Sequence, residues 1–531
     1  MHSSTGRSVV MAKNGMAATS QPLAVQAGIQ ILQQGGNAID ATICSAAAMN
    51  VVEPMATGIG GDLYMLIYLS RTKELLGLNG TGRASYEATR DYFIKKGLDK
   101  VPNHGMLAVS VPGTVDAWAL ALEKYGTMSL AKVFEPAIHY AEEGFPVTEI
   151  IAQEWKENEE LLLKHPDSKK TYLKDGKAPS AGEIFVQKDL AHTLKKIAKH
   201  GPEIFYKGEI AEAIVKFSEK NGGLLSLKDF QDHTSTWIEP VKTNYRGFDI
   251  YEISANTQGL TPLMMLNIIE GFDLKSLGHN SAESLHILIE AKKLAFADRN
   301  KYIADPEFAD IPEKWLLSKE YAEERRRLID TKRASEGFEP GIPPSKDTIY
   351  LTVVDREGNV VSYINSLFQK FGSGVTVGGT GICLQARASG FTLEEGHFNC
   401  IEPHKRPFHT NIPAMMFKDG KPYMSFGVMG ADMQPQGHVQ VVINNVDFNM
   451  NAQEAVDAAR FRHIKGKKVC LEDAILEETR KELIKMGHEI IPTEQTGLGG
   501  FGGAQAIIID PKSNVLLGGS DYRKDGCAIG Y

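Results

Sequence analysis

The sequence predicts an α+β fold in which helices cover the outer faces of packed β-sheets. The first half of the chain carries mostly segments with apolar residues at helical spacing. A Pro-rich segment interrupts it at 338–346, and the remainder is rich in short apolar runs arranged in pairs around turn sequences. Helices and antiparallel hairpins on both sides of one linker favour a sandwich with the sheets inside, and one large domain within the 531 residues.

The predicted helices of the first half begin and end at recognisable signals. Gln21 to Gln34 stops at a Gly-Gly pair, and Asn37 is placed to cap the alanine-rich segment Ala38 to Val52. A hairpin follows, with apolar runs at Leu63 to Leu69 and Leu75 to Leu78. Pro136 is expected to kink or divide one later helix. The further predicted helices are Gly113 to Tyr125, Ser129 to Glu143, Leu190 to Lys199, Glu209 to Lys220 and Ser281 to Tyr302.

The part after the linker is predicted to consist of three hairpins with two helices between them. Its strand pairs flank turn sequences such as Asp-Arg-Glu-Gly and Lys-Asp-Gly-Lys, which suit hairpin loops. The predicted pairs are Tyr350 to Val354 with Asn359 to Tyr363, Ala414 to Phe417 with Tyr423 to Phe426, and Ala504 to Ile509 with Val515 to Leu517. The predicted helices are Ala452 to Phe461 and Glu477 to Met486.

The charge balance excludes an obvious nucleic-acid surface. There are 58 basic and 66 acidic residues, a formal net charge of -8, and the short basic stretches stand beside acidic residues. The apolar run from Ala41 to Val52 is too short to span a bilayer, and residues 1–14 lack the apolar core of a secretory signal. Five cysteines without a metal-binding spacing are interpreted as buried thiols in a reducing compartment. The sequence therefore predicts a cytoplasmic protein with no nucleic-acid or membrane partner.

Several common catalytic motifs do not fit. Gly497-x-Gly499-x-x-Gly502 has the spacing of a dinucleotide fingerprint, but a strand follows it where a helix is required, so we interpret it as a glycine loop. No GxxxxGK[ST], HExxH, EF-hand or GxSxG sequence is present, so neither a cofactor nor a metal is predicted.

One route to a nucleophile needs a single residue. A threonine at a new chain N-terminus supplies a hydroxyl that attacks and an α-amine that accepts the proton. The pKa of a free α-amine is about 7.7–8.0, so much of it is neutral near pH 7. Thr348 follows the Pro-rich segment and precedes a strand sequence, which meets both requirements of such a site. This local context is weak evidence by itself, because many threonines begin strands.

The sequence around Thr348 resembles the start of the small subunit of γ-glutamyltranspeptidases, and the resemblance extends over nearly the whole chain. Motifs of this family recur in the same order along the sequence. They are Gly35-Gly-Asn-Ala-Ile-Asp-Ala41, Gly58-Ile-Gly-Gly61, Ala88-Thr-Arg-Asp91, Val111-Pro-Gly-Thr-Val115, Thr348-Ile-Tyr-Leu-Thr-Val-Val-Asp355, Phe371-Gly-Ser-Gly374, Lys405-Arg-Pro407 and Asp525-Gly-Cys-Ala-Ile-Gly-Tyr531.

The resemblance implies a four-layer αββα sandwich of the N-terminal nucleophile hydrolase type, built as one intertwined domain. It implies that Thr348 attacks the carbonyl of Asp347, and that water then releases a large subunit, 1–347, and a small catalytic subunit, 348–531. The freed Thr348 would cleave a small-molecule amide and pass the acyl group to water or to an amino acceptor. The partners implied are the two subunits of one precursor, with a higher oligomer left open.

Further roles follow position by position from the resemblance. Ser366 falls where the family has a hydroxyl residue beside the nucleophile, and Gly430 and Ala431 fall where a Gly-Gly pair offers backbone N–H groups to the oxyanion. Arg83 is expected to stand in for the family arginine that binds the substrate α-carboxylate, because Thr81 occupies the strictly aligned position.

The sequence departs from the family where the substrate ammonium is bound. Gly390 stands at the position of the family acid, Arg387 at that of a glutamine, and Phe368 at that of an asparagine. His409 and Thr410 replace a Ser-Ser pair in the predicted substrate site. Arg83 and Arg387 are candidate carboxylate anchors, with a plain salt bridge as the alternative for each.

These departures leave three hypotheses. The first is a γ-glutamyl hydrolase and transferase acting on glutathione and related compounds. The second is a glutaryl or dicarboxylate-side-chain acylase of the cephalosporin-acylase type, because the missing acid at Gly390 and the added charge of Arg387 should favour anionic acyl groups without an ammonium, unless glutamate is bound differently. The third is an uncleaved homologue that only binds small amino compounds.

Overall fold

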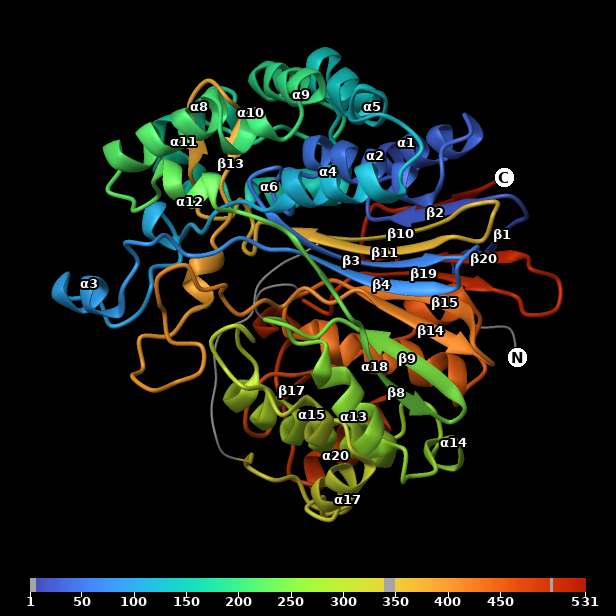
Figure 1. The fold of residues 1–531 in the computed structure, drawn as a ribbon. Helices are drawn as coiled ribbons and strands as arrows, with labels where there is room; N and C mark the ends of the chain where they lie inside the picture. The colour runs from blue at the N-terminus through green and yellow to red at the C-terminus, as the bar shows by residue number, and fades with distance from the viewer. Residues whose placement is uncertain (1–5, 339–348, 497–499) are drawn as a thin grey trace.

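The computed structural model describes residues 6–338, 349–496 and 500–531. Two seven-stranded sheets lie face to face, and helices cover the outer side of each (Figure 1). This arrangement confirms the predicted four-layer αββα sandwich. Of the predicted linker, 339–346 lies outside the described residues.

The sheet drawn higher in Figure 1, here the upper sheet, has the strand order β21-β2-β10-β11-β3-β4-β7. The lower sheet has the order β1-β20-β19-β15-β14-β9-β8, and all pairings within both sheets are antiparallel. The upper strands are Cys527–Gly530 (β21), Met16–Thr19 (β2), Ile349–Val354 (β10), Val360–Ser366 (β11), Asp62–Leu69 (β3), Glu74–Gly80 (β4) and Thr236–Ile238 (β7). The lower strands are Val10–Ala12 (β1), Leu516–Ser520 (β20), Ala504–Ile509 (β19), Lys421–Val428 (β15), Ala414–Lys418 (β14), Phe248–Glu252 (β9) and Val241–Tyr245 (β8).

Each sheet draws strands from both sides of residue 348. In the upper sheet β10 and β11 lie between β2 and β3, and in the lower sheet β14 lies beside β9. The two sequence segments predicted to become subunits therefore share both sheets. Neither segment has a sheet of this size to itself.

Helices from the first half of the chain cover the upper sheet (Figure 1). The amide of Asn37 caps α2 in a reciprocal capping box with Asp40, which fixes where this helix begins. These helices are Pro22–Gln33 (α1), Ala38–Val52 (α2), Thr114–Tyr125 (α4), Leu130–Glu143 (α5), Glu149–Lys156 (α6), Glu159–Leu163 (α7), Pro166–Tyr172 (α8), Lys188–His200 (α9), Glu203–Tyr206 (α10), Glu209–Lys220 (α11) and Leu227–Gln231 (α12). Helix α3, Arg90–Lys95, lies away from the sheet, at the left of Figure 1.

The lower sheet is covered by helices from the middle and the end of the chain (Figure 1). Helix α13 contacts β8 and β9, and α18 contacts β15. These helices are Leu260–Ile269 (α13), Leu274–Leu277 (α14), Ala282–Tyr302 (α15), Glu313–Leu316 (α16), Lys319–Arg326 (α17), Met433–Val446 (α18), Ala452–Asp457 (α19) and Glu477–Lys485 (α20). Shorter elements complete the fold: Phe145–Pro146 (β5), Ile184–Phe185 (β6), Thr376–Val377 (β12), Ile382–Cys383 (β13), Phe461–His463 (β16), Lys468–Leu471 (β17), Glu489–Ile490 (β18) and the 3₁₀ turns Met106–Ala108, Arg387–Gly390 and Thr493–Gln495.

Apolar packing on the two faces of each sheet holds the layers together. One core cluster joins the upper helices to the upper sheet, and a second joins the lower helices to β15 and β19. Every residue of α2 and of β11 is buried, so both elements lie fully inside the sandwich. The two sheets also share a polar contact, since the Thr352 hydroxyl donates to the Ser425 hydroxyl at 2.7 Å.

The predicted hairpins are confirmed, with strand ends that differ by at most three residues. The helix predicted for Ala452 to Phe461 is too long. It ends at Asp457, because Ala458 turns to an extended conformation and Phe461 begins β16 by pairing with Leu471. Helix α5 is not divided at Pro136, since its buried face, which includes Phe134 and Ala137, continues across the proline.

The remaining general expectations concern cysteines and membrane spans. All five cysteines are free thiols, four of them buried. Among the described residues, none of the helices combines the length and the apolar character needed to cross a membrane. The predicted glycine loop is described only from Gly500, and a Cβ at Gly502 would collide with the Met429 carbonyl, which supports close packing there.

Candidate active site

The Gly58–Gly61 turn brings β3 against the end of β11. A Cβ at Gly61 would lie 2.7 Å from the Ser366 carbonyl, and one at Gly60 would collide with the carbonyl of Cys383. Glycine is therefore required for this close approach of three chain segments. Asp62 follows directly as the first residue of β3 and lies opposite Ser366 in the antiparallel register.

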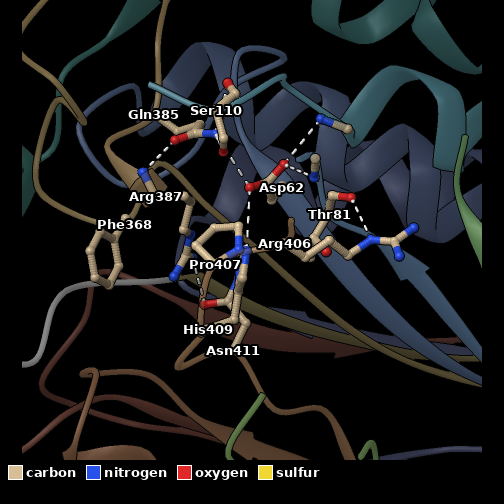
Figure 2. A network of polar contacts seen from close by, with 12 residues as sticks. Asp62, Thr81, Ser110, Phe368, Gln385, Arg387, Arg406, Pro407, His409 and Asn411 are labelled. Carbon is tan, nitrogen blue, oxygen red and sulfur yellow. Dashed lines mark hydrogen bonds and ion pairs between the residues drawn. The ribbon is translucent and has the colours of Figure 1, made fainter. Parts of the chain in front are cut away.

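Asp62 is a fully buried carboxylate at the centre of a polar network (Figure 2). Its Oδ1 accepts hydrogen bonds from the backbone N–H groups of Gly82 (3.1 Å) and Gly113 (3.0 Å). Its Oδ2 faces Gln385 Nε2 at 3.5 Å and His409 Nε2 at 3.6 Å, both long for a hydrogen bond. Burial raises the pKa of Asp62 to about 7, and the charge of Arg387 is the strongest of the influences that oppose this.

Arg387 is also fully buried, on the 3₁₀ turn that follows β13. Its Nη2 donates to Asn411 Oδ1 at 2.9 Å, and its guanidinium lies 4.6 Å from the centre of the Phe368 ring (Figure 2). Within the described parts of the chain, its Nε and Nη1 have no hydrogen-bond partner. Burial lowers the pKa of Arg387 to about 10, with Asp62 the first of the charges that oppose it.

His409 and Thr410 lie beside this pair. Burial, together with the charges of Arg387 and Arg406, holds the pKa of His409 well below its usual value, so its ring is neutral. Both ring nitrogens of His409 and the Thr410 hydroxyl lack a hydrogen-bond partner among the described residues. A buried set of unpaired donors and acceptors of this kind is unusual in a folded protein and is expected where a ligand or water binds.

Arg83 lies in a different set of contacts. Its guanidinium makes an ion pair with Glu307 at 2.7 Å and donates to the His404 carbonyl at 3.3 Å. Asp305 lies 3.7 Å away, and Arg406 binds the same Glu307 oxygen at 2.7 Å. Arg83 therefore forms a salt bridge, which was the alternative to its predicted role as a carboxylate anchor. Of the two candidate anchors, Arg387 is the one with N–H groups left unpaired by the described residues.

Gly430 and Ala431 form the turn between β15 and α18. Both adopt positive φ angles, 111° and 59°, and a non-glycine residue in that region is strained. The turn is fixed by Gln258, whose Nε2 donates to the Ala431 carbonyl at 3.0 Å, while Arg299 Nη1 donates to Gln258 Oε1 at 2.7 Å. Asp432, the N-cap residue of α18, accepts from the same Arg299 nitrogen at 2.6 Å.

Ser366 ends β11 and is fully buried. Its Oγ accepts a hydrogen bond from the Phe368 backbone N–H at 2.7 Å. The neighbouring Asn365 donates through Nδ2 to the Asp62 carbonyl (2.8 Å) and to the Thr114 hydroxyl (2.9 Å), which ties β11 to β3 and α4.

The predicted nucleophile and cleavage site, Thr348 and Asp347, lie outside the described residues. The chain position of Thr348 is informative nevertheless. It directly precedes Ile349, the first residue of β10, and Ile349 lies opposite Asn365 in β11. The next residue along β11 is Ser366, which lies opposite Asp62.

Two buried residues of this site were missed at the sequence level. Asp62 lies near Arg387 (Figure 2) because the backbone N–H groups of Gln385 and Ala386 donate to the carbonyls of Gly60 and Leu367, which brings the turn that carries Arg387 to the start of β3. Asn411 follows the His409-Thr410 pair without matching a motif. A charged residue directly after the Gly58–Gly61 motif was a signal for Asp62, since the neighbouring strand residues are apolar.

A group of metal-ligand side chains lies elsewhere, at His286, Glu290 and His488, whose ligand atoms are within 4.8 Å of one another. His286 Nδ1 and His488 Nε2 are 2.8 Å apart, the spacing of a direct hydrogen bond. Glu290 is bound by the Lys293 ammonium at 2.7 Å and by the Ser335 hydroxyl at 2.5 Å. Lysine thus neutralises the only carboxylate of the group, and we assign no metal ion to it.

Comparison with known proteins agrees with the class that fold and site define, the N-terminal nucleophile hydrolases. The γ-glutamyltranspeptidase family model matches residues 24–531. Over 99% of both chains, the protein is 40% identical to a glutathione hydrolase-like proenzyme, YwrD, of Bacillus subtilis. It is 35% identical to the glutathione hydrolase proenzyme of Escherichia coli, over 98% of this chain and 93% of that protein. A cephalosporin acylase from Bacillus halodurans superposes with a TM-score of 0.94 and 41% identity, over 100% of this chain and 98% of that chain.

The protein therefore belongs to the γ-glutamyltranspeptidase family. Membership makes it an enzyme of this kind, which removes the hypothesis of a non-catalytic homologue. It leaves open which acyl group the site prefers, since the relatives are named both as glutathione hydrolases and as acylases.

Proposed function

We propose that this protein is an autoprocessed amidohydrolase and acyltransferase that cleaves γ-glutamyl amide bonds, in glutathione and related compounds, through an acyl-enzyme on Thr348. The observation that carries this proposal is the position of Thr348 in the family fold. Thr348 is the residue before β10 in the sequence. Strand β10 lies next to β11, which ends at Ser366, and β11 in turn lies next to β3, which begins with Asp62. The strand that Thr348 precedes, the proposed orienting hydroxyl of Ser366 and the buried carboxylate of Asp62 therefore belong to three consecutive strands of one sheet, β10, β11 and β3.

Autoprocessing follows from the same residue. The Thr348 hydroxyl adds to the Asp347 carbonyl, the C–N bond between the two residues breaks, and an ester forms while the α-amine of Thr348 is released. Water then hydrolyses the ester, which gives a carboxylate on Asp347 and frees the hydroxyl. The α-amine so released can accept the hydroxyl proton in each later turnover.

The turn at Gly430 and Ala431 supports the oxyanion role. No described carbonyl accepts a hydrogen bond from either backbone N–H, and the turn lies at the N-terminus of the 14-residue helix α18. Helix N-termini carry a partial positive charge that favours an anion. The contacts of Gln258 and Arg299 hold the turn rigid, and preorganised donors are what lower the barrier for a tetrahedral intermediate.

Recognition of the acyl group is assigned to Arg387, with His409 and Thr410 beside it. Among the described residues, Arg387 has an unpaired, buried Nη1, and its Nη2 has a second N–H besides the one that it donates to Asn411, so a carboxylate can bind across the Nη1–Nη2 edge in a bidentate manner. Arg83 is a less suitable anchor, because Glu307 already neutralises it. A γ-glutamyl group and a glutaryl group both end in a carboxylate, so Arg387 serves either one.

A second candidate, a glutaryl or dicarboxylate-side-chain acylase, is favoured by one observation. Gly390, at the position of the family acid, offers no side chain, and a Cβ there would lie 2.9 Å from the Phe408 carbonyl. We also propose a reducing, cytoplasmic location, which the five free thiols support.

Hydrolysis of γ-glutamyl-p-nitroanilide and of glutaryl-p-nitroanilide by the purified, processed enzyme tests the proposal. The two acyl groups differ only in the α-ammonium. Preference for the γ-glutamyl compound supports the main proposal, and preference for the glutaryl compound supports the acylase. Release of nitroaniline from neither compound, by an enzyme that has cleaved itself, contradicts both.

A further inference from the structure

We propose that Asp62 binds the α-ammonium of a γ-glutamyl substrate while Arg387 binds its α-carboxylate, so that the two residues together recognise a zwitterion. This inference rests on the proposed function and names the acyl group that the site selects. In this assignment Asp62, the first residue of β3, supplies the carboxylate that Gly390 lacks.

The first argument is position. Asp62 lies opposite Ser366, so their side chains project from the same face of the upper sheet, with Cβ atoms about 5 Å apart. Strand β11 separates β3 from β10, and two strand spacings amount to about 9.6 Å. Four bonds of about 1.5 Å join the reacting carbonyl carbon to the α-nitrogen, which therefore lie about 5 Å apart in an extended γ-glutamyl group. Adding about 3 Å for the approach of the nucleophile gives about 8 Å, which is comparable with the two strand spacings between an ammonium site on β3 and β10, the strand that Thr348 directly precedes in the sequence.

The second argument is hydrogen-bonding capacity. Asp62 Oδ1 is occupied by two backbone N–H groups, but the side-chain nitrogens nearest to Oδ2, on Gln385 and His409, stand at 3.5 and 3.6 Å. An ammonium normally lies about 2.7–2.9 Å from a carboxylate oxygen. Within the described part of the chain, Oδ2 therefore lacks a short hydrogen bond, and the α-amine of a substrate is a charged donor that could supply one.

The third argument is charge balance. Glu307 forms ion pairs with both Arg83 and Arg406, which accounts for those two cations. Asp62 and Arg387, by contrast, are both fully buried, and among the described residues neither has an arginine, lysine or acidic partner within 4.0 Å. Isolated buried charges are costly unless a counter-charge satisfies them. One anion and one cation that do not pair with each other form the complement of a zwitterionic ligand.

A purely structural role for Asp62 is the competing explanation, because its Oδ1 fastens the turns at Gly82 and Gly113. The variant Asp62→Asn distinguishes the structural role from the proposed binding role. The amide oxygen can still accept both backbone hydrogen bonds, while the negative charge facing Arg387 is lost. A structural residue would then leave the choice between acyl groups unchanged.

The experiment compares kcat/KM for γ-glutamyl-p-nitroanilide and glutaryl-p-nitroanilide in wild type and Asp62→Asn. Loss of one charge-assisted hydrogen bond is expected to lower the γ-glutamyl to glutaryl ratio about 10- to 150-fold, with glutaryl hydrolysis changed little. Asp229→Asn is the matched control, since Asp229 is a buried carboxylate that accepts from the Tyr86 backbone N–H at 2.8 Å in another part of the fold. Its ratio should equal that of wild type.

An unchanged ratio in Asp62→Asn, with autocleavage intact, overturns the inference and leaves the proposed amidase in place. Wild type that prefers the glutaryl compound overturns the inference as well, in favour of the acylase. If Asp62→Asn does not process itself, the inference is tested on the wild-type enzyme, by comparing the inhibition of its hydrolase activity by L-glutamate and by glutarate. L-glutamate should then inhibit more strongly than glutarate, and equal inhibition overturns the inference.

Discussion

Replacement of Arg387 by methionine should abolish most activity on both acyl groups without unfolding the protein. The substitution keeps the length of the side chain and removes a guanidinium with two open N–H directions. A buried bidentate contact to a carboxylate contains two charge-assisted hydrogen bonds of about 1.5–3 kcal/mol each, so we expect kcat/KM to fall about 10²- to 10⁴-fold. The decrease should be similar for γ-glutamyl and glutaryl compounds, because both carry the carboxylate.

The stability of Arg387→Met should not fall together with its activity. Arg387 is buried, burial lowers its pKa to about 10, and its partners are the Asn411 amide and the Phe368 ring rather than an ion pair. Removing a buried cation that lacks an ion pair costs little, so the thermal midpoint of Arg387→Met is expected not to fall. Steady-state hydrolysis and thermal denaturation measure the two effects, with Arg387→Lys as the variant that keeps the charge. Wild-type kcat/KM in Arg387→Met would refute the assignment of this residue to the acyl pocket.

Two further predictions concern the reaction centre. Ser366→Ala should slow both autocleavage and turnover by about 10²-fold, because its hydroxyl is proposed to aid proton transfer. Electrophoresis against time measures autocleavage, and p-nitroanilide hydrolysis measures turnover. Wild-type rates in this variant would remove Ser366 from the mechanism. The γ-glutamyl to glutaryl ratio should rise as the pH passes through about 7, because the pKa of Asp62 is raised to about 7 and the carboxylate forms only above it. Of the other groups around Asp62, His409 is already neutral and Arg387 stays protonated at this pH, while Tyr64 has a raised pKa and Arg406 is ion-paired. The ratio should not change with pH in Asp62→Asn, and a wild-type ratio that falls or stays level would contradict the assignment.

Much of the fold could be predicted because its signals are local. The amide of Asn37 marks the start of α2, and the turn sequences mark the hairpins of both sheets. Helices α13 and α18 were not predicted, since α13 is apolar on every side and α18 is buried over 13 of its residues despite Pro435 and Gly437. Neither has the polar face by which an amphipathic helix is detected.

The candidate site was harder to predict because it is assembled from distant segments. Family resemblance drew attention to Arg387, His409 and position 390, but it assigned no role to Asp62. Asp62 and Arg387 come together only when the turn before Arg387 forms its backbone hydrogen bonds with Gly60 and Leu367, and sequence spacing does not predict those contacts. The burial and open donors that distinguish Arg387 from Arg83 are likewise properties of the folded chain alone.

The central claim is that Thr348 cuts its own chain and then catalyses amide cleavage. Intact mass and N-terminal sequencing of the purified wild type and of Thr348→Ala test it most directly. The account predicts two fragments from wild type, residues 1–347 and 348–531, the second beginning with Thr348, and a single uncut, inactive chain from Thr348→Ala. A wild type that stays in one piece, or a Thr348→Ala chain that still cleaves after Asp347, would contradict it.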